Sequence, residues 1–443
     1  MKTFKKKTVF ILGAGFSKSD NIPLQSELLK DIFLFQPDES TTINNIIDLS
    51  INEIEQKVMN YYDNFNKSRL ILADFLVNNF SSNEKRTEFN SAISIYRDDL
   101  PQTYVHLKRA YEIASEVDVT LEDLFTIFDK VILGHEHYGF YSIDINKIDI
   151  ALKFCIIFIL SYNCAQISKN ETSISRLFSR KIFDMYINRK NVNDELSIIS
   201  MNWDSLLEKE LFILSNEYNS NKPRKKIFPD LCFYDNLYKE NDKRPISTHV
   251  KAKGYINIKL LKLHGSINWL SCTYCNRIFV DYNEDIALNE LSIDCSCPEC
   301  KKNKMLEITP QMNNIIITPT FLKNLNNLHI KNIWHNAFIE LIEANKIVFI
   351  GYSFPDADFE MRYLLKKAVQ PNTRIEVVLH QSDNPDYYSL QLKKYKLKKN
   401  DHSVLLGRLY LPEKRYKSFF GDKEINFYYN GIEGYIKKER ENE

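Results

Sequence analysis

Three polar side chains in this 443-residue chain follow apolar runs at points where they could act on a substrate. Asn202 and Asp204 come directly after the apolar run 196–201, and His264 comes directly after the alternating run 256–263. Open α/β sheets bind ligands outside the carboxyl ends of their strands, so a substrate is expected near these residues. Histidine titrates near neutral pH and can take a proton from a substrate or from water. Asp204 could instead cap the next helix, and Asn202 could serve only in a turn.

A second group with the right types and spacing for chemistry is formed by cysteines. Five of the eight cysteines lie within residues 272–300, and two Cys-x-x-Cys pairs stand among them. The pairs consist of Cys272, Cys275, Cys297 and Cys300. Each pair can place two thiolates on one side of a tight turn, which predicts a closed, structural zinc site. Cys295 could replace Cys297 as a ligand, and chance clustering of free cysteines is the alternative to a metal site.

A glycine turn near the start of the chain is the third such feature. The apolar run 9–12 is followed by Gly13, Ala14, Gly15 and, two residues further, Ser17. Glycine lets the backbone approach a pyrophosphate closely, and the next helix can offer N–H groups to it. Lys18 stands where Gly-x-Gly-x-x-Gly needs its third glycine, and Ser17 stands where a Walker loop needs one. The sequence therefore indicates a nucleotide-binding turn of another type, or a tight turn without a ligand.

A parallel sheet is the element expected to position these residues. Apolar runs alternate with helical periodicity along the chain, and further strands are expected at 347–350 and 374–380. The strand at 347–350 runs into Gly351, Tyr352 and Ser353, which repeats the pattern of the opening turn. We therefore expect an α/β protein with a doubly wound, Rossmann-type sheet.

The expected sheet domain has two insertions and an extension. Residues 37–195 have long helical periodicity with few glycines, which predicts an inserted helical domain. Residues 271–302 would form a zinc ribbon inserted in the sheet domain. The sheet domain itself would comprise residues 1–36 and 196–400, and residues 401–443 would form a short β-rich extension ending in a charged tail.

Composition argues against several classes of protein. The 59 basic and 58 acidic residues give a net charge of +1, so there is no overall basic field for nucleic acid. The cysteines are too sparse for a disulfide scaffold, which favours a reducing compartment. The basic start is followed by too short an apolar run for a signal peptide, and the apolar segment 150–160 is too short to cross a bilayer. We expect a cytoplasmic protein that binds neither membrane nor nucleic acid, with 150–160 in a buried helix.

The order of these motifs resembles the sirtuin-like family. In that family a Gly-Ala-Gly turn and a serine precede a Gly-Ile-Pro, and here Ser17 precedes Asn21, Ile22 and Pro23. An Asn-x-Asp, a His-Gly, a four-cysteine ribbon and a Gly-x-Ser then follow in the family's order. The resemblance covers the sheet and the ribbon and leaves the helical insertion unexplained. It implies NAD bound across the sheet as a substrate, together with a structural zinc ion.

The resemblance also implies roles for single residues. The residues that it assigns to NAD are Gly13, Ala14, Gly15 and Ser17 at the pyrophosphate, Gly351 and Ser353 at the ribose, and Asn202 and Asp204 at the nicotinamide riboside. It assigns catalysis to Asn202, Asp204 and His264, with His264 steering or deprotonating an attacking water.

Two departures from the family bear on the reaction. Leu24 and Gln25 replace the Phe-Arg of protein deacylases, and no Phe-Gly-Glu substrate motif follows the ribbon. We therefore expect an NAD glycohydrolase similar to the NAD-depleting effectors of bacterial anti-phage defence. An NAD-dependent protein deacylase is the first alternative, and a non-catalytic module that senses NAD or ADP-ribose is the second.

Control of such a hydrolase is the last expectation from the sequence. An unrestrained NAD hydrolase would starve its own cell, and these residues carry no recognisable sensor domain. The helical insertion is therefore expected to mediate homo-oligomerisation or to bind a separate trigger protein, and to gate access to NAD. The alternative is a passive lid.

Overall fold

The structure is a computed structural model of the chain. It describes residues 6–36, 51–94, 103–134, 142–167, 170, 172–187, 195–221, 227–231, 244–245, 256–280, 297–301, 312–318, 325, 327–355, 358–380 and 411–441. Cys295, which the sequence offered as an alternative metal ligand, lies outside these residues.

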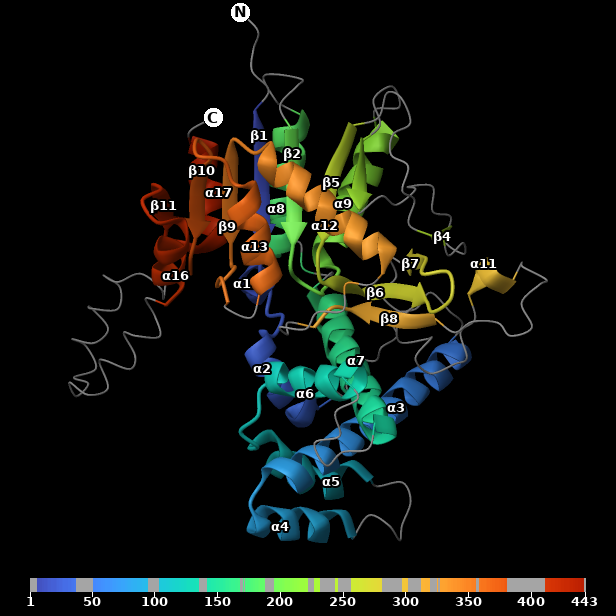
Figure 1. Ribbon diagram of the computed structural model, residues 1–443. Helices are drawn as coiled ribbons and strands as arrows, with labels where there is room; N and C mark the ends of the chain where they lie inside the picture. The colour runs from blue at the N-terminus through green and yellow to red at the C-terminus, as the bar shows by residue number, and fades with distance from the viewer. Residues whose placement is uncertain are drawn as a thin grey trace, which may run out of the picture. The chain divides into compact units, whose positions relative to one another are not determined.

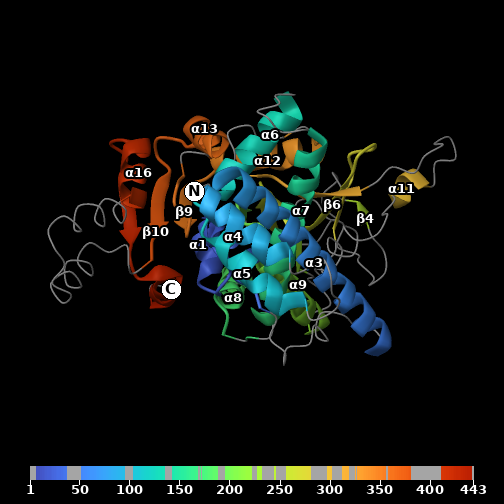
Figure 2. The ribbon, with the colours of Figure 1, turned by 90° about the horizontal axis from the view of Figure 1, so that it is seen from below.

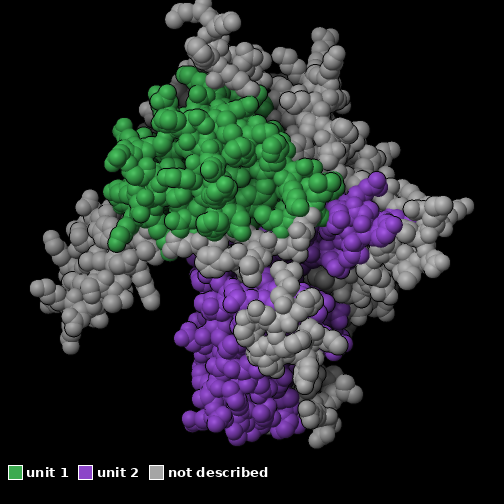
Figure 3. Space-filling view, in the orientation of Figure 1, with its two compact units in different colours: residues 1–21, 167–266, 325–443 green, residues 22–166, 267–324 purple. Residues whose placement is uncertain are grey.

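The chain divides into two compact units (Figure 3). Unit 1 comprises residues 1–21, 167–266 and 325–443, and unit 2 comprises residues 22–166 and 267–324. The division differs from the expected insertion at 37–195. The first helix of unit 2, α2 (Gln25–Leu34), packs on other helices of unit 2, whereas α8 (Ile174–Ile187) packs on strands and helices of unit 1.

A parallel sheet of seven described strands forms the centre of unit 1, in the order β11-β10-β9-β1-β2-β5-β3. Its strands are β1 (Lys7–Leu12), β2 (Glu195–Ser200), β3 (Ile227–Leu231), β5 (Ile256–Lys262), β9 (Lys346–Ile350), β10 (Arg374–Val378) and β11 (Ile425–Tyr428). Most of these are the short apolar runs that the sequence predicts as buried parallel strands. The expected Rossmann-type fold class is confirmed.

The strand order reverses beside β1. From β1 the chain adds β2, β3 and β5 on one side, with β5 between β2 and β3, and later adds β9, β10 and β11 on the other. The carboxyl ends of β1 and β9 therefore flank a topological switch point, where open α/β sheets bind their ligands.

Helices cover both faces of this sheet, as Figure 1 shows with α12 and α13 in front and α8 and α9 behind. Phe10 of β1 packs edge-on against Phe178 of α8, with ring centroids 5.5 Å apart. Phe10 is in register with Leu260 through β2, so the preceding residue Lys259 points to the opposite face. There Lys259 binds Glu340 of α12 at 2.6 Å. The helices of unit 1 in its described residues are α1 (Ala14–Lys18), α8, α9 (Leu206–Asn221), α12 (Leu328–Ile342), α13 (Phe359–Ala368), α16 (Leu411–Phe420) and α17 (Gly431–Glu441).

The C-terminal extension is largely helical in its described residues 411–441, so the expectation of a β-rich extension was wrong for this part. Helices α16 and α17 flank the short strand β11, which joins the edge of the sheet beside β10. Tyr416 is fully buried, and its ring lies 5.0 Å from that of Phe349 on β9. The aromatic residues of α16 belong to types that favour strands on average, but here they lie on a helix that packs on the sheet.

Unit 2 contains a helical group and a small second sheet. The helices are α2, α3 (Ile51–Phe80), α4 (Asn83–Ser94), α5 (Thr103–Ser115), α6 (Leu121–Gly134) and α7 (Ser142–Ile167), with the short α11 (Pro298–Lys301) near the second sheet. Figures 1 and 2 show α4 beside α5, in agreement with their contacts. In the second sheet β6 (Gly265–Cys272) lies between β7 (Ile278–Val280) and β8 (Met312–Ile316), and β6 and β7 are antiparallel. The short strand β4 (Arg244–Pro245) falls among the residues of unit 1.

Helix α7 contains the apolar segment that the sequence assigned to a buried helix. Within the described residues its part Ile145–Ile167 is long and apolar enough to cross a membrane by length and composition alone. A core helix satisfies the same criterion, and 67% of the residues in the most apolar window are buried within the protein. Lys153 on this helix pairs with Asp149 at 2.6 Å.

The turns after β1 and β9 touch each other through their backbones. A Cβ atom added at Gly13 would lie 2.6 Å from Cα of Tyr352, and one added at Gly15 would lie 2.9 Å from Cα of Gly351. Gly351 has φ +61, and a Cβ there would lie 2.1 Å from the nitrogen of Phe16. All three glycines are therefore required by the contact between the two turns.

This contact predicts a large cost for a methyl group at Gly351. Gly421 also has φ +61, but its added Cβ would meet no atom within 4 Å. Gly421→Ala should therefore lower the free energy of unfolding only by the left-handed backbone cost of about 1–2 kcal/mol. Gly351→Ala should lower it by roughly 3 kcal/mol or more, because the two turns must also separate. Urea denaturation of both variants measures the difference, and equal losses would contradict the close contact.

Candidate active site and metal centre

Asn202 and His264 occupy equivalent positions just after the neighbouring strands β2 and β5. Ser200 of β2 is in register with Lys262 of β5, and the N–H of Leu263 continues the pairing by donating to the Ser200 carbonyl at 3.0 Å. Asn202 and His264 each follow two residues after this register pair. Both are buried, with 8% and 4% of their surface exposed. The carboxyl edge of the sheet therefore brings the two together with the turn after β1.

Asn202, Ser17 and Asp204 form one hydrogen-bonded chain. The Nδ2 of Asn202 donates to the carbonyl of Gly13 at 3.0 Å and to Ser17 Oγ at 2.9 Å. Ser17 Oγ then donates to Asp204 Oδ2 at 2.7 Å. The side chain of Ser17 is thus used inside the protein, with 1% of the residue exposed.

These bonds fix the orientation of the Asn202 amide. A carbonyl oxygen only accepts hydrogen bonds, so the group facing Gly13 must be the NH₂. Oδ1 then points away from Gly13 and is buried without a hydrogen-bond partner among the described residues. Since buried polar atoms in proteins are nearly always paired, a buried acceptor of this kind without a partner is a position for a ligand or a water.

Asp204 takes the capping role that the sequence offered as one possibility, and it also binds Ser17. Its Oδ2 accepts from Ser17, and its Oδ1 accepts from the N–H of Leu206 at 3.3 Å, at the first residue of α9. One carboxylate therefore caps a helix and holds the Asn202–Ser17 pair.

The predicted phosphate turn is only partly exposed. The N–H of Gly13 donates to the Ile350 carbonyl at 3.0 Å, and the N–H of Gly15 donates to the Gly351 carbonyl at 2.8 Å. Gly13 is buried, Gly15 is half-buried and Ala14 is exposed. The surface that this turn offers to a ligand is therefore centred on Ala14.

The residues after β9 lie at the same edge. Gly351 is half-buried, and Ser353 is exposed. The Ser353 carbonyl accepts from Arg415 of α16 at 3.3 Å. The structure thus brings the two predicted turns and the Asn202–Asp204 segment to one edge of the sheet.

A buried ion pair lies beneath the Asn202–Asp204 segment. Lys262 at the end of β5 is 1% exposed and pairs with Glu208 of α9 at 2.6 Å. Its ammonium group also binds the main-chain carbonyl of Asp204 and donates to Ser266 Oγ at 3.0 Å. Ser266 Oγ in turn lies 3.1 Å from the Trp203 carbonyl. The pair therefore fixes the backbone between Asn202 and Asp204.

The electrostatics of this pair are set by burial. Desolvation raises the pKa of Glu208, and the attraction of Lys262 acts in the opposite direction without cancelling it. A buried carboxylate of this kind needs its cation to remain ionised.

His264 is enclosed by groups from two later elements. Trp334 of α12 donates from Nε1 to the Leu263 carbonyl at 3.1 Å, and its ring centroid lies 6.4 Å from that of His264. Asp358, at the start of α13, places Oδ1 3.6 Å from His264 Nε2. A carboxylate at this distance forms an ion pair when the histidine is protonated.

Lys262, Glu208 and Asp358 are the residues near the site that the sequence reasoning did not select. The sequence could have indicated Lys262, because it is a charged residue between the apolar residues Leu261 and Leu263. Glu208 follows Asp204 at helical spacing. Asp358 lies 94 positions after His264 in the sequence, and nothing local connects the two.

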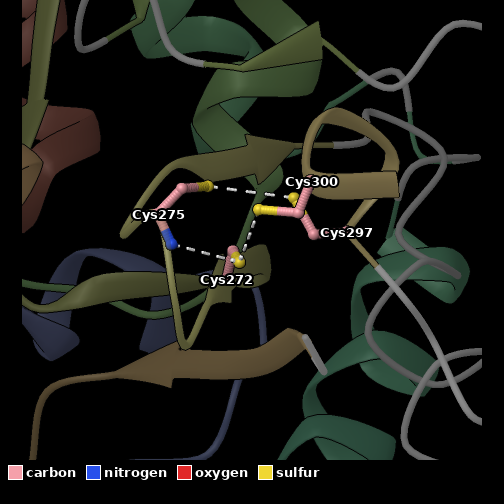
Figure 4. Close-up of side chains that lie close together, drawn as sticks. All are labelled: Cys272, Cys275, Cys297 and Cys300. Carbon is pink, nitrogen blue, oxygen red and sulfur yellow. Dashed lines mark hydrogen bonds between the residues drawn. The ribbon is translucent and has the colours of Figure 1, made fainter. Parts of the chain in front are cut away.

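The four predicted cysteines of unit 2 form one cluster (Figure 4). All four Sγ atoms lie within 4.8 Å of one another. Cys272 ends β6 and Cys275 stands in the following turn, where Asn276 has φ 56. Cys297 directly precedes α11, and Cys300 lies on it.

The cluster fits a tetrahedral metal ion. The Cys272–Cys300 and Cys275–Cys297 sulfur pairs are each 3.8 Å apart. A tetrahedron of Zn–S bonds of about 2.3 Å has sulfur–sulfur edges of about 3.8 Å. The cluster therefore could hold zinc, and its four protein ligands would leave no open position for chemistry.

Backbone groups of the turn prepare Cys272 for this role. The N–H groups of Tyr274 and Cys275 each approach its sulfur to 3.4 Å. Burial acts to raise the pKa of Cys272, but these N–H groups and the neighbouring thiols outweigh it and leave the pKa below its ordinary value. The thiolate, which is the form that binds metal, is thereby favoured.

Comparison with known proteins gives distant structural similarities. No family model matches the sequence, and no curated protein matches it. Among solved structures, the chain is similar to a Sir2 homologue in complex with NAD, with 10% identity, 99% of this chain and 90% of that chain covered, and a TM-score of 0.35. It is similar to a mutant Sir2 homologue in complex with ADP-ribose, with 11% identity, 95% of both chains covered and a TM-score of 0.31. TM-scores of this size do not define a common fold, so the fold and chemistry of this chain rest on its own residues.

The buried pair predicts a pH-dependent loss of stability in Lys262→Met. This change leaves Glu208 buried without its cation and should cost about 3–5 kcal/mol near neutral pH. In the folded protein the pKa of Glu208 is raised above its ordinary 4.5, so burial favours the protonated carboxyl group. Rising pH removes this proton, and the folded protein then loses stability. The deficit relative to wild type should therefore grow from about pH 5 to about pH 8.

The double variant Lys262→Met/Glu208→Leu is the control for this prediction. Removing both charges should restore much of the loss and abolish its pH dependence. Urea denaturation across the pH range measures both, and a pH-independent deficit in Lys262→Met would contradict the assignment.

The cysteine cluster predicts about one zinc ion per chain, measured by elemental analysis. Cys272→Ser and Cys300→Ser should lose the metal and unfold at lower temperature, because metal binding contributes to folding free energy. Cys164→Ser changes a buried cysteine outside the cluster and should keep the metal. A metal-free wild-type protein of equal thermal stability would refute the site.

Proposed function

We propose that the chain is an NAD glycohydrolase, which cleaves NAD to nicotinamide and ADP-ribose. The observation that carries this proposal is the fixed amide of Asn202. Its Oδ1 is a buried acceptor at the carboxyl edge of the sheet, at the position equivalent to that of His264 on the next strand. An acceptor and a titratable base at the ends of neighbouring strands can together hold and activate a water.

The position of these groups supports a dinucleotide substrate. They lie at the carboxyl ends of β2 and β5, next to the switch point beside β1. We assign the pyrophosphate to the turn Gly13–Ser17, with contact at the exposed Ala14. Ser353 and Gly351 are assigned to the ribose. Asn202 and Asp204 are assigned to the nicotinamide riboside, and in this assignment Ser17 acts by holding them.

The reaction needs a water more than it needs a strong base. Breaking the bond between C1′ and the nicotinamide nitrogen develops oxocarbenium character on the ribose. Asn202 Oδ1 accepts a hydrogen bond from the attacking water, and His264 steers the water or takes its proton. General-base help is worth roughly 10²- to 10⁴-fold, so positioning and electrostatics supply most of the acceleration.

Hydrolysis is proposed over deacylation because of the sequence around the site. Leu24 and Gln25 stand where protein deacylases have Phe-Arg, and no Phe-Gly-Glu motif follows the cysteines. A protein deacylase is the second candidate. A sensor that binds NAD without cleaving it would have no need of a histidine beside the water position.

The cellular role that we propose is that of a cytoplasmic, NAD-depleting effector of anti-phage defence. Such an enzyme must be silent until triggered. We assign its control to the helical insertion of unit 2, through homo-oligomerisation or through a separate trigger protein. Specific activity measured across a dilution series, with molecular mass followed by light scattering, tests this; a monomer of constant, full activity would exclude it.

The proposal predicts that the protein, alone or with its trigger, releases nicotinamide and ADP-ribose from NAD. His264→Ala and Asn202→Ala should reduce turnover by roughly 10²-fold or more, because they remove the base and the water acceptor. Product analysis by chromatography measures this. His380→Ala, which changes an exposed histidine of the same unit, should keep wild-type turnover.

Adding an acylated peptide distinguishes the candidates. Turnover without peptide selects the hydrolase, turnover only with peptide selects the deacylase, and binding without product selects the sensor. Full turnover in His264→Ala and Asn202→Ala would remove both residues from the mechanism.

A further inference from the structure

The carboxylate of Asp358 is a buried charge that the proposed mechanism does not yet use. The residue is 4% exposed and stands at the N-cap position of α13. An aspartate at this position ordinarily accepts from the first N–H groups of the helix. Asp358 makes no side-chain cap bond. Its carboxylate faces two other side chains instead.

Those two side chains are His264 and Tyr352. Oδ1 of Asp358 lies 3.6 Å from His264 Nε2, and Oδ2 accepts from the Tyr352 hydroxyl at 2.9 Å. The carboxylate therefore joins the turn after β9 to the end of β5. The three residues come from two separate parts of the sequence, around 264 and 352–358, and meet in unit 1.

The direction of the Tyr352 bond is fixed by burial. Desolvation and the nearby charge of Asp358 raise the pKa of Tyr352 well above its ordinary value of 10. The hydroxyl therefore stays protonated and donates to Asp358. With one oxygen held in this way, the other oxygen is kept toward the imidazole.

The turn that carries Tyr352 is itself held by the C-terminal extension. Tyr416 of α16 donates from its hydroxyl to the Tyr352 carbonyl at 2.8 Å. Phe354, two residues further, has φ 56 and is fully buried, with its ring 4.9 Å from Tyr416 and 4.7 Å from Phe419. A phenylalanine in the left-handed region is costly and persists only where packing holds it. The position of Asp358 is thus determined by α16 as well as by α13.

We propose that Asp358 is a positioning residue for His264. Its carboxylate, 3.6 Å from Nε2 and too far for a hydrogen bond, orients the imidazole by its charge and favours a proton on Nε2; Tyr352 fixes the carboxylate. This inference rests on the proposed function for its catalytic meaning. The alternative is that the carboxylate only stabilises the fold.

The first test reads the histidine directly and needs no activity. Full-length protein carrying ¹⁵N-labelled histidine is examined by two-dimensional NMR, and the His264 signals are assigned by their loss in His264→Gln. We expect the wild type to show the Nε2–H form, and Asp358→Asn to change the nitrogen shifts of His264. Unchanged shifts in Asp358→Asn would overturn the proposal.

Glu376 and Tyr435 provide a matched control pair. Glu376 is 8% exposed and accepts from the Tyr435 hydroxyl at 2.9 Å, on β10 and α17. Glu376→Gln and Tyr435→Phe remove a buried carboxylate and a buried hydroxyl as Asp358→Asn and Tyr352→Phe do, but away from His264. They should leave the His264 shifts unchanged.

The second test uses turnover of NAD. Asp358→Asn should lower kcat by roughly 10²-fold with little change in KM, since only the base is disturbed. Tyr352→Phe should lower kcat by a smaller factor and keeps the test available if Asp358→Asn fails to fold. If Asp358→Asn lowers kcat no more than Glu376→Gln and Tyr435→Phe do, Asp358 has only a structural role.

The two tests separate the two proposals. A wild-type protein that does not cleave NAD removes the proposed function, while the NMR result still decides whether Asp358 orients His264. Cleavage of NAD with unchanged His264 shifts in Asp358→Asn keeps the proposed function and removes the role of Asp358.

Discussion

The contact between the turns after β1 and β9 is the constraint on which the site depends. Three glycines allow two backbones to meet where side chains would collide. Each turn then presents its next residues in a fixed place: Ser17 reaches Asn202 and Asp204 on one side, and Tyr352 reaches Asp358 on the other. The need for glycine here comes from the protein itself before any ligand is considered.

Buried charge organises the rest of the edge. The Lys262–Glu208 pair lies below the Asn202–Asp204 segment, and Asp358 lies beside His264. Burying such groups is costly, so each survives only with good partners. Their partners come from different strands and helices. Displacing one of these elements therefore removes the partner of a buried charge on another.

Features that depend on the spacing of nearby residues could be predicted from the sequence. The short apolar strands, the turns at Gly13 and Gly351 and the two cysteine pairs all depend on residues a few positions apart, and the structure contains each of them. The pairing of Lys262 with Glu208 and of Asp358 with His264 could not be predicted, because it arises only when the sheet brings distant segments together. The helices of the C-terminal extension were also missed, because α16 is held by packing on β9, which lies far from it in the sequence.

The bond from Tyr416 to the Tyr352 carbonyl has a consequence for synthesis of the chain. Protein emerges from the ribosome with its N-terminus first, so β1, β2 and β5 are available long before α16. The turn after β9 lacks its clamp, and the sheet lacks its last strand, until translation has passed β11. A nascent chain therefore contains Asn202 and His264 before the turn after β9 is held by α16. The site is completed only near the end of translation.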